Sequence, residues 1–360
     1  MAKPTWLPLP LTSGNVTADW LTVALADRYP GVAVTSAQIV NIMEGTSTKI
    51  RVALEYNARG RELGLPPRLI VKGGFEEHSA RMAFMYESEM RYYRDLAPVQ
   101  NLNVPKSYFT GKDPNSYQAI VIMEDLDAKG ATFCRAERPL NYDQVSRFLD
   151  ALARLHAQWW GSPELEAGGK FEWVLNNFSS DGWAYYNHYL VPDTWRALMA
   201  QPRGAAVSQR LHDREWMLRA LQHIAAMRHK HPKTFVHGDT HLGNLYIEAD
   251  GTPGFVDSQM RREPWYQDVT YHLIGALDPV NRRQWEQSLL AYYLERLKTY
   301  GVSNAPAYDE AWDLYKREIT YGLFVFLQNE NWSLKEATNT VAAMRFGSAA
   351  IDHKLYELIP

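Results

Sequence analysis

Two carboxylates and an amide bracket a short apolar hairpin in the second half of the chain. Asp239 precedes Asn244 by five residues in FVHGDTHLGN, and Asp257 follows Asn244 by thirteen. The segment 244–257 reads as two apolar runs around an Asp-Gly turn, which is the pattern of a β-hairpin. Because the two ends of a hairpin lie together, we expect these three side chains to converge on one volume.

Oxygen donors of this kind suit a hard cation such as Mg²⁺, which keeps some waters and takes phosphate oxygens as further ligands. Phosphoryl transfer needs little more from a protein: an Asp to deprotonate the acceptor hydroxyl, an Asn and an Asp on Mg²⁺, and a Lys on the phosphates. The spacing D-x-x-x-x-N from Asp239 to Asn244 matches that catalytic-loop template, and Asp257 stands where the metal-binding Asp belongs. Taken singly, each residue is equally well interpreted as a turn residue. The three residues together at this spacing favour a role in phosphoryl transfer.

A lysine in the first third of the chain can supply the cation. Lys72 ends the apolar run RLIVK, where a charge on a strand is costly unless it has a partner. Glu89 follows seventeen residues later on an amphipathic helix and is the predicted partner, with Glu87 as the competing candidate. The alternative for Lys72 is an exposed lysine at a strand end.

The first 125 residues read as a small antiparallel α+β lobe. Strand-like runs rich in β-branched residues alternate with turns, and two helical patterns accompany them. The expected strands are 37–44, 49–56, 67–74, 107–111 and 119–124, the expected helices are 17–28 and 79–96, and 57–67 is expected to be a loop.

The remaining residues read as a larger and mainly helical lobe. Amphipathic stretches follow one another, and we expect the hairpin at 244–257 to be the only β-structure among them. The expected helices are 141–160, 210–228, 282–300, 311–328 and 334–353. The composition changes abruptly at EDLDAKG (124–130), so we place the boundary between residues 1–125 and 126–360.

These motifs resemble those of a known family. HGDTHLGN and VDSQ, with the EDL junction and the E-x-x-Y-Y helix, are similar to the aminoglycoside phosphotransferase-like kinases, and most similar to their ecdysteroid-kinase-like (CHK-like) branch. The resemblance runs from about residue 40 to the C-terminus and is strongest at 235–270. It implies a protein-kinase-like fold of two lobes, with transfer of the γ-phosphate of ATP to the hydroxyl of a small molecule.

The resemblance also implies roles for individual residues. Asp239 would be the catalytic base, Asn244 and Asp257 the Mg²⁺ ligands, and His237 and Asp268 the braces of the catalytic loop. The nucleotide contacts would come from the first lobe: Lys72 on the α- and β-phosphates, Glu89 holding Lys72, and the backbone of Glu124 and Leu126 on adenine.

Two features depart from the family pattern. Ser258 replaces the aromatic residue that usually follows the metal-binding Asp, which implies looser packing toward the Glu89 helix. The nucleotide loop reads EGTSTK and lacks G-x-G-x-x-G, although Gly45, Thr46, Ser47 and Thr48 can still cradle phosphates through their amides and hydroxyls. This loop is equally well read as an ordinary turn. No G-x-x-x-x-G-K-[ST] occurs, which excludes a P-loop as the phosphate site.

Composition and charge exclude several other classes. The 38 basic and 41 acidic side chains give a net charge of -3, so there is no excess of cations to displace counterions from nucleic acid. The single cysteine cannot form an internal disulfide. No signal peptide or apolar run long enough to span a membrane is present, so we expect a cytoplasmic protein. His237 and His241 are four residues apart, but Gly238 stands where H-E-x-x-H needs Glu, so a metallohydrolase is a distant alternative.

The acceptor is predicted to be a bulky and largely apolar alcohol, sterol-like or hydroxyacyl. The segments expected to build its site are rich in aromatic rings, which bury large areas at low entropic cost. The rings are Phe171, Trp173, Phe178, Trp183, Tyr185, Tyr186, Tyr189, Trp195, Trp312, Phe324 and Trp332. Core packing is the alternative for each ring. The alternative functions are an aminoglycoside- or choline-type kinase and a kinase-like nucleotide-binding protein without activity. No oligomeric state is indicated.

Overall fold

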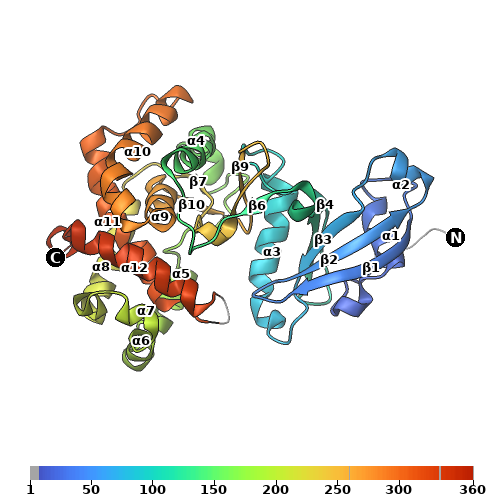
Figure 1. Cartoon of the computed structure of the whole chain (residues 1–360), viewed down its shortest axis with the longest axis horizontal. Helices are drawn as coiled ribbons and strands as arrows, with labels where there is room; N and C mark the ends of the chain where they lie inside the picture. The colour runs from blue at the N-terminus through green and yellow to red at the C-terminus, as the bar shows by residue number, and fades with distance from the viewer. Residues whose placement is uncertain (1–7, 259, 332–333, 360) are drawn as a thin grey trace. The chain divides into compact units, whose positions relative to one another are not determined.

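The structure, a computed structural model, describes residues 8–258, 260–331 and 334–359. It divides into two compact units (Figure 1). The first contains the chain up to Val99 together with Val104–Thr132, and the second contains Gln100–Asn103 and the chain from Phe133 onward. Strands dominate the first unit and helices the second, which confirms the predicted α+β class.

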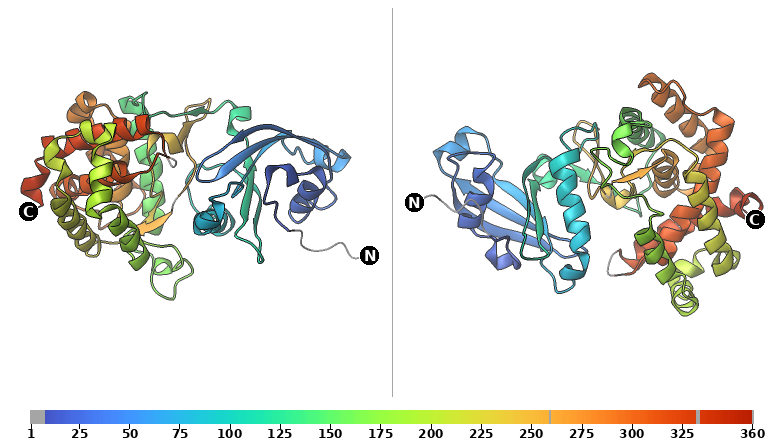
Figure 2. Two further views of the ribbon diagram at one scale, coloured as in Figure 1. Left: turned by 90° about the horizontal axis from the view of Figure 1, so that it is seen from below. Right: turned by 180° about the vertical axis from the view of Figure 1, so that it is seen from behind.

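A five-stranded antiparallel sheet forms the first unit, in the order β1-β2-β3-β5-β4. Its strands are β1 (Val34–Met43), β2 (Thr48–Tyr56), β3 (Arg68–Gly73), β4 (Ser107–Lys112) and β5 (Ala119–Glu124), and Figure 2 shows them from two further sides. Along β2, buried residues alternate with half-buried ones, so Ile50 and Val52 face the core while Lys49 and Arg51 face the other side. Helix α1 (Ala18–Ala26), capped by Thr17, packs into that core.

The predicted helix at 79–96 is continuous but irregular. It begins with a 3₁₀ turn at Ser79–Met82, continues as α3 (Ala83–Arg91) and ends in a π-helical turn at Tyr92–Leu96. The expectation of a plain loop at 57–67 is wrong, because Asn57 caps a short helix there, α2 (Ala58–Glu62). Capping by the Asn side chain outweighs the poor helix propensity of Gly60.

Ten helices lie in the described part of the second unit. Five of them match the predicted helices within a few residues: α4 (Tyr142–Trp159), α8 (Arg214–Arg228), α10 (Pro279–Thr299), α11 (Tyr308–Gln328) and α12 (Glu336–Asp352). The sequence patterns did not indicate the other five: α5 (Ser180–Tyr189), α6 (Pro192–Met199), α7 (Pro202–Ala205), α9 (Tyr266–Ala276) and α13 (Leu355–Leu358). All eleven residues of α9 are buried, so it shows no apolar stripe.

Short strands carry the functional segment of this unit. The hairpin consists of β8 (Leu245–Ile247) and β9 (Pro253–Phe255). A second antiparallel pair joins β7 (Thr234–Val236) to β10 (Arg261–Glu263), so the expectation of a single hairpin is wrong. These strands have three residues each, which is too short for a period-two pattern to stand out. Strand β6 (Thr132–Phe133) lies where the chain passes from one unit to the other.

Among the helices that the structure describes, none combines the length and the apolar character needed to cross a membrane.

Candidate active site

The β8–β9 hairpin brings two of the predicted metal ligands together. Leu245 pairs with Phe255, and beyond this pair the N–H of Val256 donates to the carbonyl of Asn244 at 2.9 Å. Asp257 therefore leaves the hairpin beside the residue at which the hairpin begins. Its φ of +54° lies in the left-handed region, which costs free energy in a residue other than glycine and is typical of functional turns.

Asn244 also contacts the predicted base. Its Nδ2 donates to the Oδ2 atom and to the main-chain carbonyl of Asp239, both at 3.0 Å. Because Nδ2 contacts Asp239, the Oδ1 atom is the atom of Asn244 that would serve as the predicted metal ligand. The Asn244 side chain is buried, whereas the Asp239 carboxylate keeps 31% of its surface exposed. An acceptor hydroxyl can therefore reach Asp239.

The donor set fits Mg²⁺ better than a metal held entirely by protein. One amide oxygen and one carboxylate lie at the hairpin end, and Mg²⁺ binds with few protein ligands because it keeps waters and takes phosphate oxygens. Within residues 8–258, 260–331 and 334–359, no group of three or more His, Cys, Asp or Glu side chains could hold a metal ion.

Helix α9 holds the predicted catalytic loop through side-chain hydrogen bonds to its main chain. Asp268 accepts hydrogen bonds from the main-chain N–H groups of His237, at 2.6 Å, and Gly238, at 2.9 Å. Gln267 donates to the carbonyl of Gly238 at 3.4 Å. The two loop N–H groups and the loop carbonyl are thus satisfied by one helix.

His237 links this loop to the segment that carries the predicted metal ligand Asp257. Its Nδ1 accepts from the N–H of Asp239 at 3.3 Å, so its Nε2 carries the proton that bonds the Val256 carbonyl at 3.0 Å. Burial lowers the pKa of His237 although Asp268 and Asp239 lie nearby. His237 is therefore a neutral spacer between the base and the residue before Asp257, which agrees with the bracing role that the resemblance implies.

Two contacts to the loop were not anticipated from sequence. Gln267 and Tyr271 both lie on α9, and the Tyr271 hydroxyl donates to Asp239 Oδ1 at 3.2 Å. The only available signal was their spacing from Asp268, one residue before and three after, which places all three near one face of a helix. The spacing has this meaning only in a helix, and the sequence did not indicate that α9 is one.

In the first unit, Lys72 forms an ion pair with Glu89. Its Nζ lies 2.6 Å from Glu89 Oε1, and the two side chains keep only 4% and 12% of their surfaces exposed. The competing candidate, Glu87, instead pairs with Lys112 on β4, where both side chains are well exposed. Whether Lys72 binds phosphates stays a prediction.

The loop before β2 is tied to its own unit. Thr48 is buried and its hydroxyl donates to Glu76 Oε1 at 2.7 Å, while the Tyr86 hydroxyl on α3 donates to the carbonyl of Thr46 at 2.7 Å. The Thr48 hydroxyl is thus already engaged, and Gly45, Thr46 and Ser47 are half-buried. Any phosphate contact from Thr48 would come through its N–H.

The junction after β5 is braced by charge. Asp125 is buried and lies 3.0 Å from Arg51 Nε and 3.3 Å from Arg68 Nε. The N–H of Glu124 donates to the Lys106 carbonyl at 3.0 Å, so adenine contacts at this junction would fall to the carbonyl of Glu124 and the N–H of Leu126. Sequence reasoning found the junction but not the role of its Asp.

Residues 64–310 match the phosphotransferase enzyme family (APH), which covers more than half of the chain. The chain belongs to this family. The predicted class of enzyme, a small-molecule kinase with an alcohol group as acceptor, is thereby confirmed. No curated protein matches the sequence.

Two solved structures show the fold of this phosphotransferase. An ethanolamine kinase from Plasmodium vivax matches with a TM-score of 0.53 and 11% identity, over 87% of this chain and 81% of that one. The complex of APH(2″)-IIIa with GDP and kanamycin matches with a TM-score of 0.51 and 12% identity, over 88% and 96% of the two chains. The predicted kinase-like fold is confirmed.

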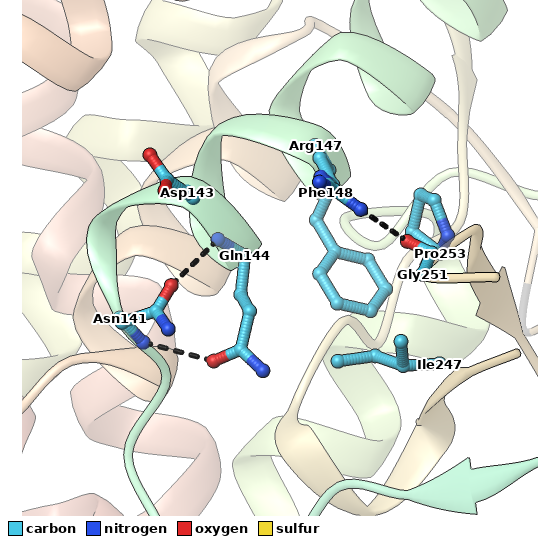
Figure 3. Close-up of a pocket in the computed structure, with 8 residues that line it drawn as sticks. All are labelled: Asn141, Asp143, Gln144, Arg147, Phe148, Ile247, Gly251 and Pro253. Carbon is cyan, nitrogen blue, oxygen red and sulfur yellow. Dashed lines mark hydrogen bonds between the residues drawn. The ribbon is translucent and has the colours of Figure 1, made fainter. Parts of the chain in front are cut away.

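A separate cavity in the phosphotransferase contains none of the predicted residues. It has a volume of about 250 Å³ and lies between the start of α4 and the β8–β9 hairpin (Figure 3). Asn141 and Gln144 face each other there in a reciprocal capping box, and Arg147 donates to the Gly251 carbonyl at 3.0 Å. These groups satisfy one another, so the cavity adds nothing to the site.

The aromatic residues expected to line the acceptor site mostly belong to the core of the phosphotransferase. Phe171, Phe178, Tyr186, Tyr189, Trp195 and Phe324 are buried. Trp173, Trp183 and Trp312 are half-buried and Tyr185 is exposed, whereas Trp332 lies outside the described residues. Among the rings that the structure describes, only these four half-buried or exposed ones can present a face to an acceptor without movement.

Proposed function

We propose that this phosphotransferase uses ATP and Mg²⁺ and moves the γ-phosphate to a hydroxyl of a small molecule. The observation that carries the proposal is the contact of Asn244 with Asp239 at one end of the hairpin whose other end leads into Asp257. A base and two oxygen ligands lie within one short loop-and-hairpin unit. Phosphoryl transfer needs that combination, because positioning and charge stabilisation supply nearly all of its catalysis.

In the proposed reaction, Asp239 accepts the proton of the acceptor hydroxyl. The hydroxyl oxygen forms a bond to the γ-phosphorus as the bond from that phosphorus to the bridging β,γ-oxygen breaks, and ADP leaves with the electron pair. Asn244 orients Asp239 by its two N–H groups and offers Oδ1 as a ligand. Mg²⁺, held by Asn244 and Asp257, would neutralise charge on the phosphates.

The first unit is proposed to bind the nucleotide. Lys72 would contact the α- and β-phosphates, and its ion pair with Glu89 supports this because a buried ammonium needs an orienting partner. Main-chain N–H groups of Gly45–Thr48 would add phosphate contacts, and Glu124 and Leu126 would bind adenine. This keeps nucleotide binding in residues 1–125 and catalysis with acceptor binding in 126–360, in a cytoplasmic enzyme.

For the acceptor, we propose a bulky and largely apolar alcohol, as in the ecdysteroid-kinase-like branch. The net charge of -3 and the rings of Trp183 and Tyr185 on α5 support this class. Aromatic faces also attract cations, so an amino alcohol of the ethanolamine or choline type is the alternative. A screen of sterol-like alcohols, hydroxyacyl compounds, amino alcohols and aminoglycosides with MgATP separates the two. Phosphorylation of polyamine sugars alone would reject the apolar class.

The central test of the function is the Asp239→Ala substitution. We expect kcat to fall at least about 100-fold, because general-base catalysis contributes that much, while the Kd for ATP stays within about two-fold. The measurements are ADP release with the best acceptor of the screen and calorimetric binding of ATP. A variant that turns over at the wild-type rate would show that Asp239 is not the base.

A further inference from the structure

We propose that Tyr271 is a positioning residue that holds the carboxylate of Asp239 in its reactive orientation. The inference rests on the proposed function, because it gives Tyr271 a role in the reaction only if Asp239 is the base. It goes beyond the motif, which supplies Asp239 and Asn244 and contains nothing corresponding to a tyrosine 32 residues further along the chain.

The two oxygens of Asp239 are held by different donors. Tyr271 donates its phenolic proton to Oδ1 at 3.2 Å, and Asn244 donates an amide proton to Oδ2 at 3.0 Å. A carboxylate oxygen can accept more than one hydrogen bond, so each oxygen keeps capacity for an acceptor hydroxyl. One donor alone would leave the carboxylate able to rotate about its Cβ–Cγ bond. The second donor on the opposite oxygen fixes that rotation.

The Tyr271 ring is itself held in place. It stacks on Phe326 of α11, with centroids 5.4 Å apart and 26° between the ring planes, and it contacts Phe346 of α12 at 5.6 Å. Tyr321, five residues before Phe326 on α11, adds a third ring at 6.3 Å. These three rings pack against the Tyr271 ring while its hydroxyl donates to Asp239.

The donor is a neutral group. Burial raises the pKa of Tyr271 well above its ordinary value of 10, and the nearby charge of Asp239 raises it further. Tyr271 therefore keeps its proton and can only donate to Asp239. A cationic donor would stabilise the carboxylate more strongly and so weaken it as a base, whereas a phenol orients it with a smaller effect of that kind.

The test is Tyr271→Phe, which removes the hydroxyl and keeps the ring packing. The matched control is Tyr315→Phe, another fully buried tyrosine whose hydroxyl donates to a carboxylate, Glu286, at 2.9 Å. The probe is MgATP turnover to ADP with the best acceptor of the screen. We expect kcat to fall about ten-fold in Tyr271→Phe, because a misplaced reacting group loses its near-attack geometry. KM for ATP should stay within two-fold.

A double variant distinguishes positioning from stability. In the Asp239→Ala background, Tyr271→Phe should lower the residual rate by less than two-fold, because residues that act through one another are not additive. An unchanged kcat in Tyr271→Phe, an equal loss in Tyr315→Phe, or a full ten-fold further loss in the double variant would each overturn the inference. A wild-type enzyme that phosphorylates none of the acceptors in the screen would instead overturn the proposed function, and this inference with it.

Discussion

At the scale of single residues, the buried ion pair of the first unit is the feature most open to test. Lys72 keeps only 4% of its side chain exposed, so its ammonium depends on the Glu89 carboxylate at 2.6 Å. Removing one partner of a buried pair leaves an uncompensated charge. The proposed phosphate contact of Lys72 requires that ammonium to be charged and held in one place.

The first prediction is therefore that Glu89→Gln raises KM for ATP about ten-fold, because a misplaced lysine loses phosphate contact. The control is Glu87→Gln, which breaks the exposed pair with Lys112 and should change KM less than about two-fold. The measurement is the initial rate against ATP concentration for both variants. Equal effects of the two substitutions would contradict the assignment of Glu89.

The sequence could indicate residues whose spacing is local and whose types are chemically distinctive. Asp239, Asn244 and Asp257 lie within nineteen positions, and Lys72 stood out as a charge in an apolar run. Tyr271 could not be anticipated, because a tyrosine in a buried helix looks like any core aromatic. Its contact with Asp239 depends on how α9 packs against the loop that carries Asp239, which is a tertiary feature.

At the scale of elements, hydrophobic periodicity predicted the long helices that expose one face to solvent. It did not predict the short helices or the fully buried one. Helix α4 shows a clean apolar stripe and was predicted, whereas α9 is buried on all sides and shows none. Helices α5, α6 and α7 are short, and α6 and α7 each begin with a proline, so no pattern persists over enough turns. The predicted strands of the first unit were found because β-branched and apolar residues dominate each run, with alternating burial along β2 and continuous burial along most of β3.

A buried cluster links α10 to α11 and α12. Glu286 on α10 contacts Arg282 at 2.9 Å, His353 at 3.0 Å and the Tyr315 hydroxyl at 2.9 Å, and Asp352 also pairs with Arg282. Burial by itself would raise the pKa of Glu286, but the hydrogen bonds and charges of His353 and Arg282 outweigh it and hold the pKa below 4.5. The carboxylate thus stabilises the fold only when it is charged.

The second prediction concerns the pH dependence of this contribution. Because the folded pKa of Glu286 lies below the unfolded value, its stabilisation is full above about pH 5 and is lost as the pH falls through the folded pKa. Glu286→Gln should lower the free energy of unfolding by about 3 kcal/mol at pH 7, and by progressively less below pH 4.5. Urea unfolding of both proteins from pH 7 to 3 measures the difference. A constant difference over that range would contradict the assignment.

At the scale of the whole molecule, the proposed contacts of one nucleotide are divided between two compact units. Lys72 and Glu89 belong to the first unit, and Asn244 and Asp257 belong to the second. A ligand that binds only the folded chain stabilises it by RT ln(1 + [L]/Kd), which is about 2.7 kcal/mol at one hundred times Kd. Stabilisation by a single nucleotide should therefore depend on residues from both units.

The third prediction is that Mg²⁺ with the non-hydrolysable analogue AMP-PNP raises the melting temperature of the wild-type protein, and that Lys72→Met and Asp257→Asn each remove most of this rise. Each variant weakens the binding of AMP-PNP through a residue of a different unit, so the same ligand concentration stabilises the protein less.

Lys112→Met is the control for charge, because Lys112 is exposed and pairs with the exposed Glu87. Melting curves with AMP-PNP alone separate the metal from the nucleotide: Asp257→Asn should matter only when Mg²⁺ is present. If Asp257→Asn reduced the rise equally without Mg²⁺, its proposed role as a metal ligand would be wrong, while the nucleotide role of Lys72 would stand.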